Sequence, residues 1–381
     1  MPQLAKHHRC TGCTACAAAC PKGCVEMKAD IDGFCYPIID ESRCIRCGLC
    51  ENVCPVLNQI NTVHTPVACA AKSGDDTLRM ASTSGGVFPE LARDVLRRGG
   101  AVFGAAYDES FRVIHICVEK EADLFRLQGA KYAQSDLGGS FWDVRRRLDL
   151  GQHVLFSGTP CQILGLKSFL KRDYKNLLLV DLVCHSVPSP LAWETYLQYI
   201  SGEKTLTTVN LRCKDTGWSR YSYCNRFDFS DGTCRKDLSD KSLYMRLFGG
   251  GYISRPACSN CPAKGYARVS DLTLGDFWGI WDIASELDDN RGTSMVLVQT
   301  EKGRAAIARL DLYSVTLEEA SRMNPAMLTS AIENPMHKQI MALVREGCFV
   351  EADQMITAMA HHRPSLARRM LGFLKRKIRL Q

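Results

Sequence analysis

The sequence predicts a small α+β domain at the N-terminus, a larger α/β layered domain after it, and a basic helical tail. Two runs of four cysteines define the first part, whereas from residue 66 onward short apolar runs alternate with helical patterns. Basic side chains gather around spaced apolar ones at the end of the chain. We therefore place the domains at residues 1–61, 66–334 and 335–381.

Composition indicates a globular protein that has no need of a disulfide scaffold. The chain has 381 residues, 46% of them hydrophobic, and 20 cysteines. Disulfide frameworks serve small secreted domains, and the opening MPQLAKHHRC lacks the apolar segment of a secretory signal. We therefore expect a cytoplasmic protein with reduced thiols, in which clustered cysteines indicate metal binding or catalysis.

The two cysteine runs have the same spacing. Each reads C-x2-C-x2-C-x3-C followed by proline, which is the run of bacterial ferredoxins with two 4Fe-4S clusters. The fourth cysteine of each run binds the other cluster. The ligands predicted for the first cluster are Cys10, Cys13, Cys16 and Cys54, and those for the second are Cys44, Cys47, Cys50 and Cys20. The alternatives are disulfides or zinc, but zinc ligands usually come in pairs separated by a longer spacer.

The rest of the first domain contains one predicted strand and two further cysteines. Residues 33–40 read as a short strand between the two runs. Cys24 and Cys35 lie outside the runs, and we interpret them as small core residues rather than as ligands.

The larger domain follows a linker near residues 62–66. Its expected strands are 67–73, 101–108, 113–119, 153–158 and 177–184, and its expected helices are 84–100, 140–151, 162–172 and 190–200. Residues 206–213 and 221–236 break the alternation and read as strands, the latter pair joined by a turn at Asp231-Gly232. Residues 295–300 read as a late strand. The alternation predicts an α/β layered sheet.

Four turns of this domain carry chemical signals. STSGGV, residues 82–87, follows a strand and opens a helix, where free amides suit phosphate; an ordinary helix cap explains it equally well. In FSGTPCQI, Thr159 and Pro160 begin a helix and place Cys161 where the helix dipole favours a thiolate. Cys184 ends an apolar strand in DLVCHS, and RPACSNC supplies a C-x2-C pair. The four thiols Cys161, Cys184, Cys258 and Cys261 match the number needed for a third 4Fe-4S cluster, although chance grouping and burial as small residues explain them as well.

In this order the motifs STSGGV, QGAKYAQS, FSGTPCQI, DLVCHS and RPACSNC…DLTLGDFWG resemble those in the family of coenzyme F-420 hydrogenase/dehydrogenase beta subunits. The resemblance runs from about residue 66 to about residue 300. With the cysteine-rich N-terminus, the chain looks most like the bacterial branch that carries a fused two-cluster ferredoxin domain.

The resemblance implies a flavin, FAD or FMN, beside a third 4Fe-4S cluster on the four cysteines just named. The residues that it assigns to flavin binding are Ser84, Gly85, Gly86, Lys131, Tyr132, Gly158, Thr159 and Asp276. A turn cap is the alternative role for Asp276. Relatives usually read Cys-His-Gly where this chain has Ser186 after His185, which bears on how closely the backbone approaches a ligand. His185 is a candidate proton donor, with a structural role as the alternative.

The resemblance therefore implies an iron–sulfur flavoprotein oxidoreductase. Electrons would pass between the ferredoxin-type clusters and a flavin that exchanges hydride with coenzyme F-420 or another small organic substrate. A second hypothesis is a reductase of a polysaccharide-pathway intermediate. A third is a non-catalytic electron-transfer subunit that serves a redox partner protein.

The C-terminal tail suggests a partner of its own. Residues 366–381 mix Leu366, Met370, Phe373, Leu374 and Ile378 with basic residues, and the whole chain has a formal charge of +7. A basic amphipathic helix can lie on an anionic membrane surface or dock a protein, so peripheral attachment at the inner membrane surface is one hypothesis. A solvated basic helix is the other. No recognition motif accompanies the charge, so we expect no nucleic-acid partner.

Overall fold

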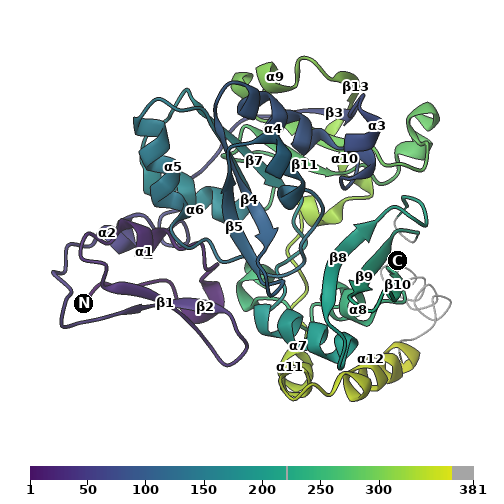
Figure 1. Cartoon of the computed structure of the whole chain (residues 1–381). Helices are drawn as coiled ribbons and strands as arrows, with labels where there is room; N and C mark the ends of the chain where they lie inside the picture. The colour runs from purple at the N-terminus through teal and green to yellow at the C-terminus, as the bar shows by residue number, and fades with distance from the viewer. Residues whose placement is uncertain (220–221, 363–381) are drawn as a thin grey trace, which may run out of the picture.

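The computed structural model describes residues 1–219 and 222–362. Figure 1 shows three parts: the N-terminal domain beside α5 and α6, a large sheet with its helices, and a small sheet with the C-terminal helices. The helices are α1 Ala15–Ala19, α2 Leu49–Asn52, α3 Asp76–Met80, α4 Val87–Arg97, α5 Ser140–Asp149, α6 Pro160–Leu170, α7 Pro190–Ser201, α8 Leu243–Gly249, α9 Glu301–Ile307, α10 Leu317–Arg322, α11 His337–Arg345 and α12 Phe349–His362. Among the described residues no helix is both long and apolar enough to cross a membrane.

The N-terminal domain contains an antiparallel strand pair, β1 (Val25–Ala29) and β2 (Cys35–Ile39), and the short helices α1 and α2. Each helix begins within a cysteine run after a residue with left-handed backbone, Thr14 before α1 and Gly48 before α2. The positive φ turns the chain sharply just after two cysteines, which lets a short segment present several thiols to one space.

The large sheet has eight strands in the order β13-β3-β12-β11-β7-β6-β4-β5. Their bounds are β3 Val67–Lys72, β4 Ala101–Tyr107, β5 Val113–Val118, β6 Val154–Gly158, β7 Leu177–Leu182, β11 Leu272–Asp276, β12 Ser294–Val298 and β13 Asp311–Val315. Strands β4, β6, β7 and β11 are parallel, and the other pairings are antiparallel. The carboxyl ends of the parallel strands therefore share one edge, where α/β proteins place their binding sites.

Helices cover both faces of this sheet. Apolar side chains of α4, Leu91 among them, pack on one face with β6 and β7, whereas α5 and α6 pack on the other with Phe141 and Ile163. The core of this second face also takes in Cys13 and Val53 of the N-terminal domain. The small domain is thus packed against the outer side of α6 rather than tethered by a free linker.

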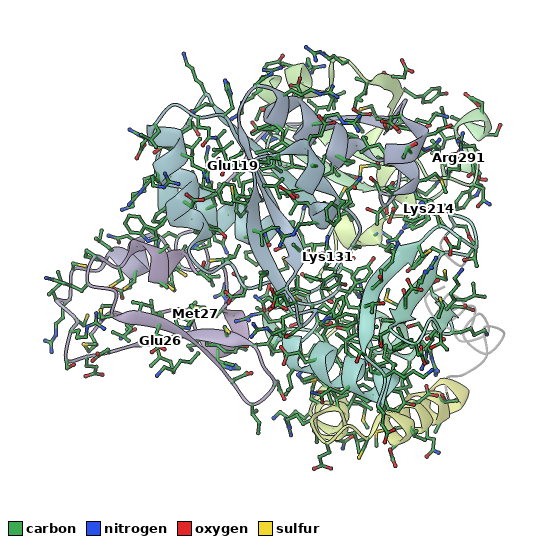
Figure 2. All side chains as sticks on the ribbon, in the orientation of Figure 1. Glu26, Met27, Glu119, Lys131, Lys214 and Arg291 are labelled. Atoms are coloured by element: carbon green, nitrogen blue, oxygen red, sulfur yellow. The ribbon has the colours of Figure 1, made fainter. Side chains whose placement is uncertain are left out.

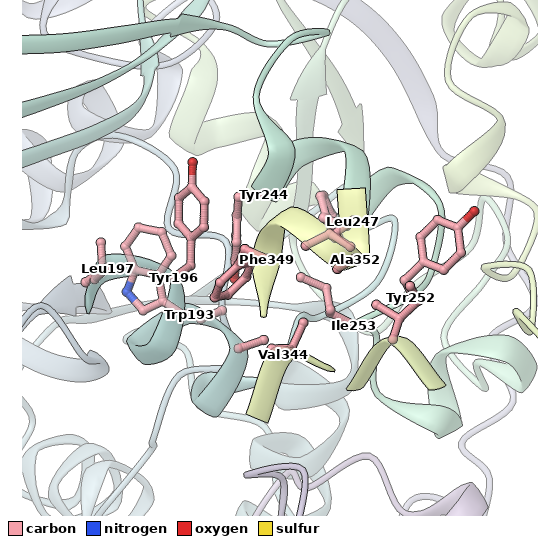
Figure 3. Packing of buried hydrophobic residues seen from close by; sticks show 14 of the residues in the cluster. Trp193, Tyr196, Leu197, Tyr244, Leu247, Tyr252, Ile253, Val344, Phe349 and Ala352 are labelled. Atoms are coloured by element: carbon pink, nitrogen blue, oxygen red, sulfur yellow. The ribbon is translucent and has the colours of Figure 1, made fainter. Parts of the chain in front are cut away.

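The small antiparallel sheet has the order β10-β9-β8, with β8 Leu206–Cys213, β9 Cys224–Phe229 and β10 Cys234–Leu238. It shares one core with α7, α8, α11 and α12. Figure 3 shows Tyr196, Tyr244 and Phe349 in this core, and the ring of Phe349 lies 5.5 Å from that of Tyr196. Helices α11 and α12 are therefore integral to the fold, although the sequence suggested a separate tail from residue 335. The amphipathic segment 366–381 lies outside the described residues.

The expected strands and helices of the larger domain are present, and the mixed α/β architecture is confirmed. The hairpin at Asp231-Gly232 joins β9 to β10, with Gly232 at φ +80°. The sheet is mixed rather than wholly parallel because β3, β5, β12 and β13 pair antiparallel with their neighbours. Strand β11, which the sequence analysis treated only as part of a motif, lies at the centre of the sheet beside β7.

If α12 is part of the core, Phe349→Ala will destabilise the protein markedly. Phe349 is 1% exposed, and truncating a buried phenylalanine costs about 3–5 kcal/mol. Val350 is 51% exposed on the same helix and gives the control, Val350→Ala. We expect the midpoint of anaerobic thermal unfolding to fall clearly for Phe349→Ala only. Equal midpoints for the two variants would contradict the assignment of α12 to the core.

Candidate iron–sulfur sites and an adjoining cationic site

The four cysteines predicted for the first cluster line one cavity. Its lining includes Cys10, Cys13, Cys16 and Cys54. The fourth ligand comes from the second run, as the ferredoxin spacing requires. Thr11 also lines this cavity, and its buried hydroxyl has no partner among the described residues. The donor set and the unused hydroxyl therefore fit a cluster whose sulfurs accept hydrogen bonds.

The lining of a second cavity includes Cys20, Cys44, Cys47 and Cys50. These are the ligands predicted for the second cluster. Cys24 lines the same cavity, with its Sγ 3.3 Å from that of Cys20. Cys24 is thus buried beside a ligand position rather than in an apolar core, and Cys35 is exposed, so the core interpretation of Cys35 is wrong.

The four cysteines of the third group meet at the shared edge of the parallel strands. Cys161 lies in the first turn of α6, directly after β6, and Cys184 follows β7. Cys258 lies in the 3-10 helix Pro256–Asn260, and Cys261 comes directly after it. Two hydrogen bonds fix the surrounding backbone, from Lys264 Nζ to the carbonyl of Cys184 (2.7 Å) and from the amide of Cys261 to Ser330 Oγ (3.0 Å).

Burial and the charges of neighbouring cysteines raise the pKa values of three of these thiols. Burial and then Cys261 raise the pKa of Cys161 to about 11, and burial and then Cys258 raise that of Cys184 well above its usual value. Burial raises the pKa of Cys258 to about 12. The helix start therefore does not lower the pKa of Cys161, because desolvation outweighs it. Thiols that cannot ionise together lose their protons when iron binds them, so the group suits a metal cluster.

Within residues 1–219 and 222–362, no three His, Cys, Asp or Glu side chains stand close enough to hold a single metal ion. A 4Fe-4S cluster makes a different demand, because each thiolate binds a different iron and the ligands surround a wider space. The three cysteine groups match that demand in number and in ligand type.

The first and third cysteine groups adjoin each other. A β-carbon added at Gly165 would stand 2.7 Å from Cβ and 2.9 Å from Sγ of Cys13, so α6 packs at this glycine against Cys13, which lines the first cavity. Cys161 lies one helical turn before Gly165, and the charge of its thiol contributes to the raised pKa of Cys13. The sequence could not show this contact, because it joins segments about 150 residues apart.

Arg212 in β8 brings two flavin candidates together. Its guanidinium donates to the hydroxyl of Tyr132 (2.9 Å) and to the carboxylate of Asp276 (2.9 Å), and the side chain is 7% exposed. Its Nε is buried and has no partner among the described residues. The guanidinium also lies over the rings of Tyr223, Trp218 and Trp278, at 4.1, 4.4 and 5.5 Å from their centres. We call Arg212, Tyr132, Asp276 and these three rings the Arg212 group.

Lys214 connects the Arg212 group to the STSGGV turn. Its Nζ donates to the carbonyls of Ser84 and Arg79, each at 2.7 Å, and it lies near the end of β8 in Figure 2. Burial, and then the charge of Arg79, lower the pKa of Lys214 to about 7. Arg212 of β8 and Lys214, which directly follows the strand, thus hold Ser84, Tyr132 and Asp276 in one region.

The glycine amides of the STSGGV turn have partners within the chain. The amide of Gly85 donates to Ser294 Oγ (3.0 Å), and that of Gly86 donates to the carbonyl of Thr83 (3.3 Å). A β-carbon at Gly85 would meet the carbonyl of Ala71 at 2.5 Å, so close packing requires this glycine. The turn therefore differs from the row of free amides expected for phosphate, and its flavin role stays a prediction.

Of the remaining flavin candidates, Lys131 contacts its own loop, whereas Gly158 and Thr159 lie beside the third cysteine group. Lys131 turns back on its own loop and donates to the carbonyl of Gln128 (2.7 Å), and burial lowers its pKa to about 7. Gly158 and Thr159 lie beside Cys161, where Thr159 Oγ1 is 3.2 Å from the Cys161 Sγ.

His185 is exposed, and the edge of its ring packs against Phe248. Phe248 also contacts Tyr132 of the Arg212 group, with the ring centres 5.1 Å apart. The hydroxyl of Ser186 pairs with that of Ser254 (2.7 Å), so the serine that replaces the expected glycine faces inward.

The sequence analysis missed Arg212, Lys214 and Arg255. A signal existed for the first two, since LRCKD places two basic residues two positions apart at the end of a predicted strand. Arg255, 1% exposed, donates to the carbonyls of Cys10 (2.7 Å) and Cys35 (3.0 Å) and to Gln134 Oε1 (2.7 Å). Only the fold reveals that contact, since the residues are distant in sequence.

Comparison with known proteins assigns both parts of the chain. Residues 151–321, which contain the third cysteine group and Arg212, match the family described as the C terminus of the beta subunit of coenzyme F420 hydrogenase/dehydrogenase. Residues 9–58 match the 4Fe-4S dicluster domain family. The resemblance seen in the sequence is thereby confirmed, as is an iron–sulfur domain at the N-terminus.

The curated relatives match only parts of their own length. The chain is 23% identical over 195 residues to the F subunit of the F(420)H(2) dehydrogenase of Methanosarcina mazei, covering 48% of this chain and 55% of that protein. It is 40% identical over 55 residues to the I subunit of the NADH-quinone oxidoreductase of Pelobacter propionicus, covering 12% of this chain and 30% of that protein. The chain thus spans about half of the first relative and under a third of the second.

Among solved structures, the chain is similar to a chain of the F420-reducing [NiFe] hydrogenase complex from Methanosarcina barkeri. The two are 15% identical, with a TM-score of 0.46, over 78% of this chain and 93% of that one.

If Cys184 binds a cluster, Cys184→Ser will remove about four irons from the purified protein, because one cubane holds four. The matched control is Cys213→Ser, since Cys213 is a buried cysteine outside the three groups. Iron and sulfide analysis of anaerobically purified variants measures the difference. An unchanged iron content in Cys184→Ser, or an equal loss in the control, would contradict the third site.

Proposed function

We propose that this chain is an iron–sulfur flavoprotein oxidoreductase. It passes electrons between ferredoxin-type 4Fe-4S clusters and a flavin that exchanges hydride with coenzyme F-420 or another small organic substrate. The observation that carries the proposal is the packing of Cys13, from the first group, against Gly165 of α6, the helix that also carries Cys161 of the third group.

The sites follow one another in space. The second cavity lies in the N-terminal domain with the exposed Cys47, and the first cavity lies against α6. From the third group, Cys184 leads to His185, whose ring contacts Phe248, and Phe248 contacts Tyr132. This order supports entry of electrons at the second site and their use near the Arg212 group.

A flavin beside the third group would supply the exchange between one-electron and two-electron steps that the reaction needs. In this proposal Arg212 binds and orients the cofactor through its unpaired Nε, while Asp276 and Tyr132 hold the guanidinium in place. The rings of Trp218 and Trp278, stacked 6.2 Å apart, supply aromatic surface and exclude water. Lys214, with a pKa near 7, is suited to hold a proton or to lose it at neutral pH.

A second candidate function is a non-catalytic electron-transfer subunit. The internal bonds of the Gly85 and Gly86 amides favour it, because they leave the turn fewer donors for a flavin phosphate. The names of both curated relatives describe subunits, which suits a protein redox partner in either case. We also propose that the protein is cytoplasmic and that its basic C-terminus lies at a membrane surface.

Cofactor analysis of one anaerobic preparation separates the two functions. The oxidoreductase should contain about twelve irons and twelve sulfides, enough for three cubanes, with one flavin per chain. About twelve irons without flavin, even after incubation with FAD or FMN, would favour the electron-transfer subunit. About eight irons would contradict the third cluster, and the proposal with it.

If Arg212 binds the flavin, Arg212→Met will lower the flavin content at least tenfold without lowering the iron content. Losing hydrogen bonds to a charged group costs about 1.5–3 kcal/mol, which is a tenfold to hundredfold loss of affinity. Arg226→Met is the control, because Arg226 lies in the same small sheet but pairs at the surface with Asp228 and Asp215. Flavin absorbance after gel filtration gives the measurement. Normal flavin in Arg212→Met would refute the assignment.

A further inference from the structure

The side chain of Arg255 occupies the contact between the N-terminal domain and the larger domain. Its Nε donates to the carbonyl of Cys10, and another donor reaches the carbonyl of Cys35. The guanidinium also lies 4.2 Å from the centre of the Tyr36 ring. Arg255 itself belongs to the larger domain and precedes Cys258 by three residues, so one side chain contacts both halves of the proposed electron path.

This guanidinium is a buried charge without a carboxylate partner. Arg255 is 1% exposed, and none of the ion pairs among the described residues includes it. Two carboxylates of the N-terminal domain in this region are engaged elsewhere, Asp30 with His7 and Asp32 with Arg345. The oxygens that it does contact are neutral ones of Cys10, Cys35 and Gln134. A buried charge of this kind is costly unless opposite charge lies close by.

The opposite charge is available from the cysteine groups on two sides. The Arg255 side chain contacts the backbone of Cys10, a ligand candidate of the first cluster, and its own carbonyl accepts a hydrogen bond from the amide of Cys258 in the third group (2.9 Å). A cluster held by four thiolates is negatively charged, and its charge becomes more negative on reduction. Net charge near a cluster is one of the factors that set its reduction potential.

We propose that Arg255 is a positioning residue that supplies a shared positive charge to the first and third clusters and raises the reduction potential of both. Arg255 would thereby stabilise the reduced states of the first and third clusters, which lie on either side of the contact between the two domains. The step between them moves one electron from one cluster to the other and forms or breaks no bond. This inference rests on the proposed function, since it needs the third cluster.

Lys264 provides a matched comparison. Its Nζ donates to the carbonyl of Cys184, and its charge acts on the Cys184 thiol, so it serves the third group. The bonds of its Nζ are to the carbonyls of Cys184 and Ala326, and neither residue belongs to the N-terminal domain. Arg255 should therefore affect two clusters, and Lys264 one.

The experiment is a redox titration of the full-length, cluster-loaded protein followed by electron paramagnetic resonance. Signals are assigned by their loss in Cys16→Ser for the first cluster and in Cys184→Ser for the third. Arg255→Gln should lower both potentials, with at least a tenfold drop in the reduced fraction at a fixed potential, or about 59 mV for one electron. Lys264→Gln should lower that of the third cluster alone, and Arg255→Lys should stay near the wild type.

Gln134→Glu tests the same charge without removing Arg255. Gln134 Oε1 accepts a hydrogen bond from the guanidinium at 2.7 Å, so a carboxylate there would neutralise it and should also lower both potentials. If Arg255→Gln fails to retain its clusters, the reduction potentials of Gln134→Glu test the role of the Arg255 charge instead. Unchanged potentials in Gln134→Glu, or an equal shift in Arg255→Lys and Arg255→Gln, would overturn the role of the charge.

Iron content separates failure of this inference from failure of the proposed function. About twelve irons with unshifted potentials would overturn the role of Arg255 and leave the three-cluster proposal standing. About eight irons in the wild type would remove the third cluster, and both proposals would fall.

Discussion

The architecture depends on the packing of the first cysteine run against α6. Gly165 lets the helix touch Cys13, and no larger residue fits without displacing the Cys13 side chain, since its β-carbon would stand 2.7 Å away. Arg255 also joins the two domains, because its side chain donates a hydrogen bond to the carbonyl of Cys10. Because electron transfer weakens steeply with distance, a contact that holds two cluster sites together is a functional constraint as well as a structural one.

The sequence analysis succeeded where a short pattern determines local chemistry. The spacing of Cys10 to Cys20 and of Cys44 to Cys54 identified the dicluster domain, and the crossed assignment of Cys54 and Cys20 agrees with the linings of the two cavities. Most strands followed from apolar runs, which buried parallel strands such as β6 and β7 retain on both faces. Patterns of this kind are local, so they can be seen without the fold.

What the sequence missed depends on contacts between distant segments. Arg212 and Arg255 looked like ordinary basic residues, because a sequence pattern says nothing about which carbonyl or ring a guanidinium reaches. Helices α11 and α12 were assigned to a basic tail, yet Val344 and Phe349 are fully buried in the core of the small sheet. The thiol of Cys161 illustrates a competition of effects: the helix start favours its ionisation, but burial among other thiols outweighs it.

The balance between ionisation and burial also explains why positively charged side chains lie near the third cysteine group. Four half-buried thiols repel one another when ionised, and bound iron would remove most of that cost. The remaining negative charge would need compensation within the protein. Two positively charged side chains can provide it: Arg255, which contacts Cys10, and Lys264, which contacts Cys184. Neither has a carboxylate partner among the described residues. A cation that pairs with no carboxylate among the described residues is explained most simply by an anion that it is placed to meet, and in our proposal that anion is the cluster.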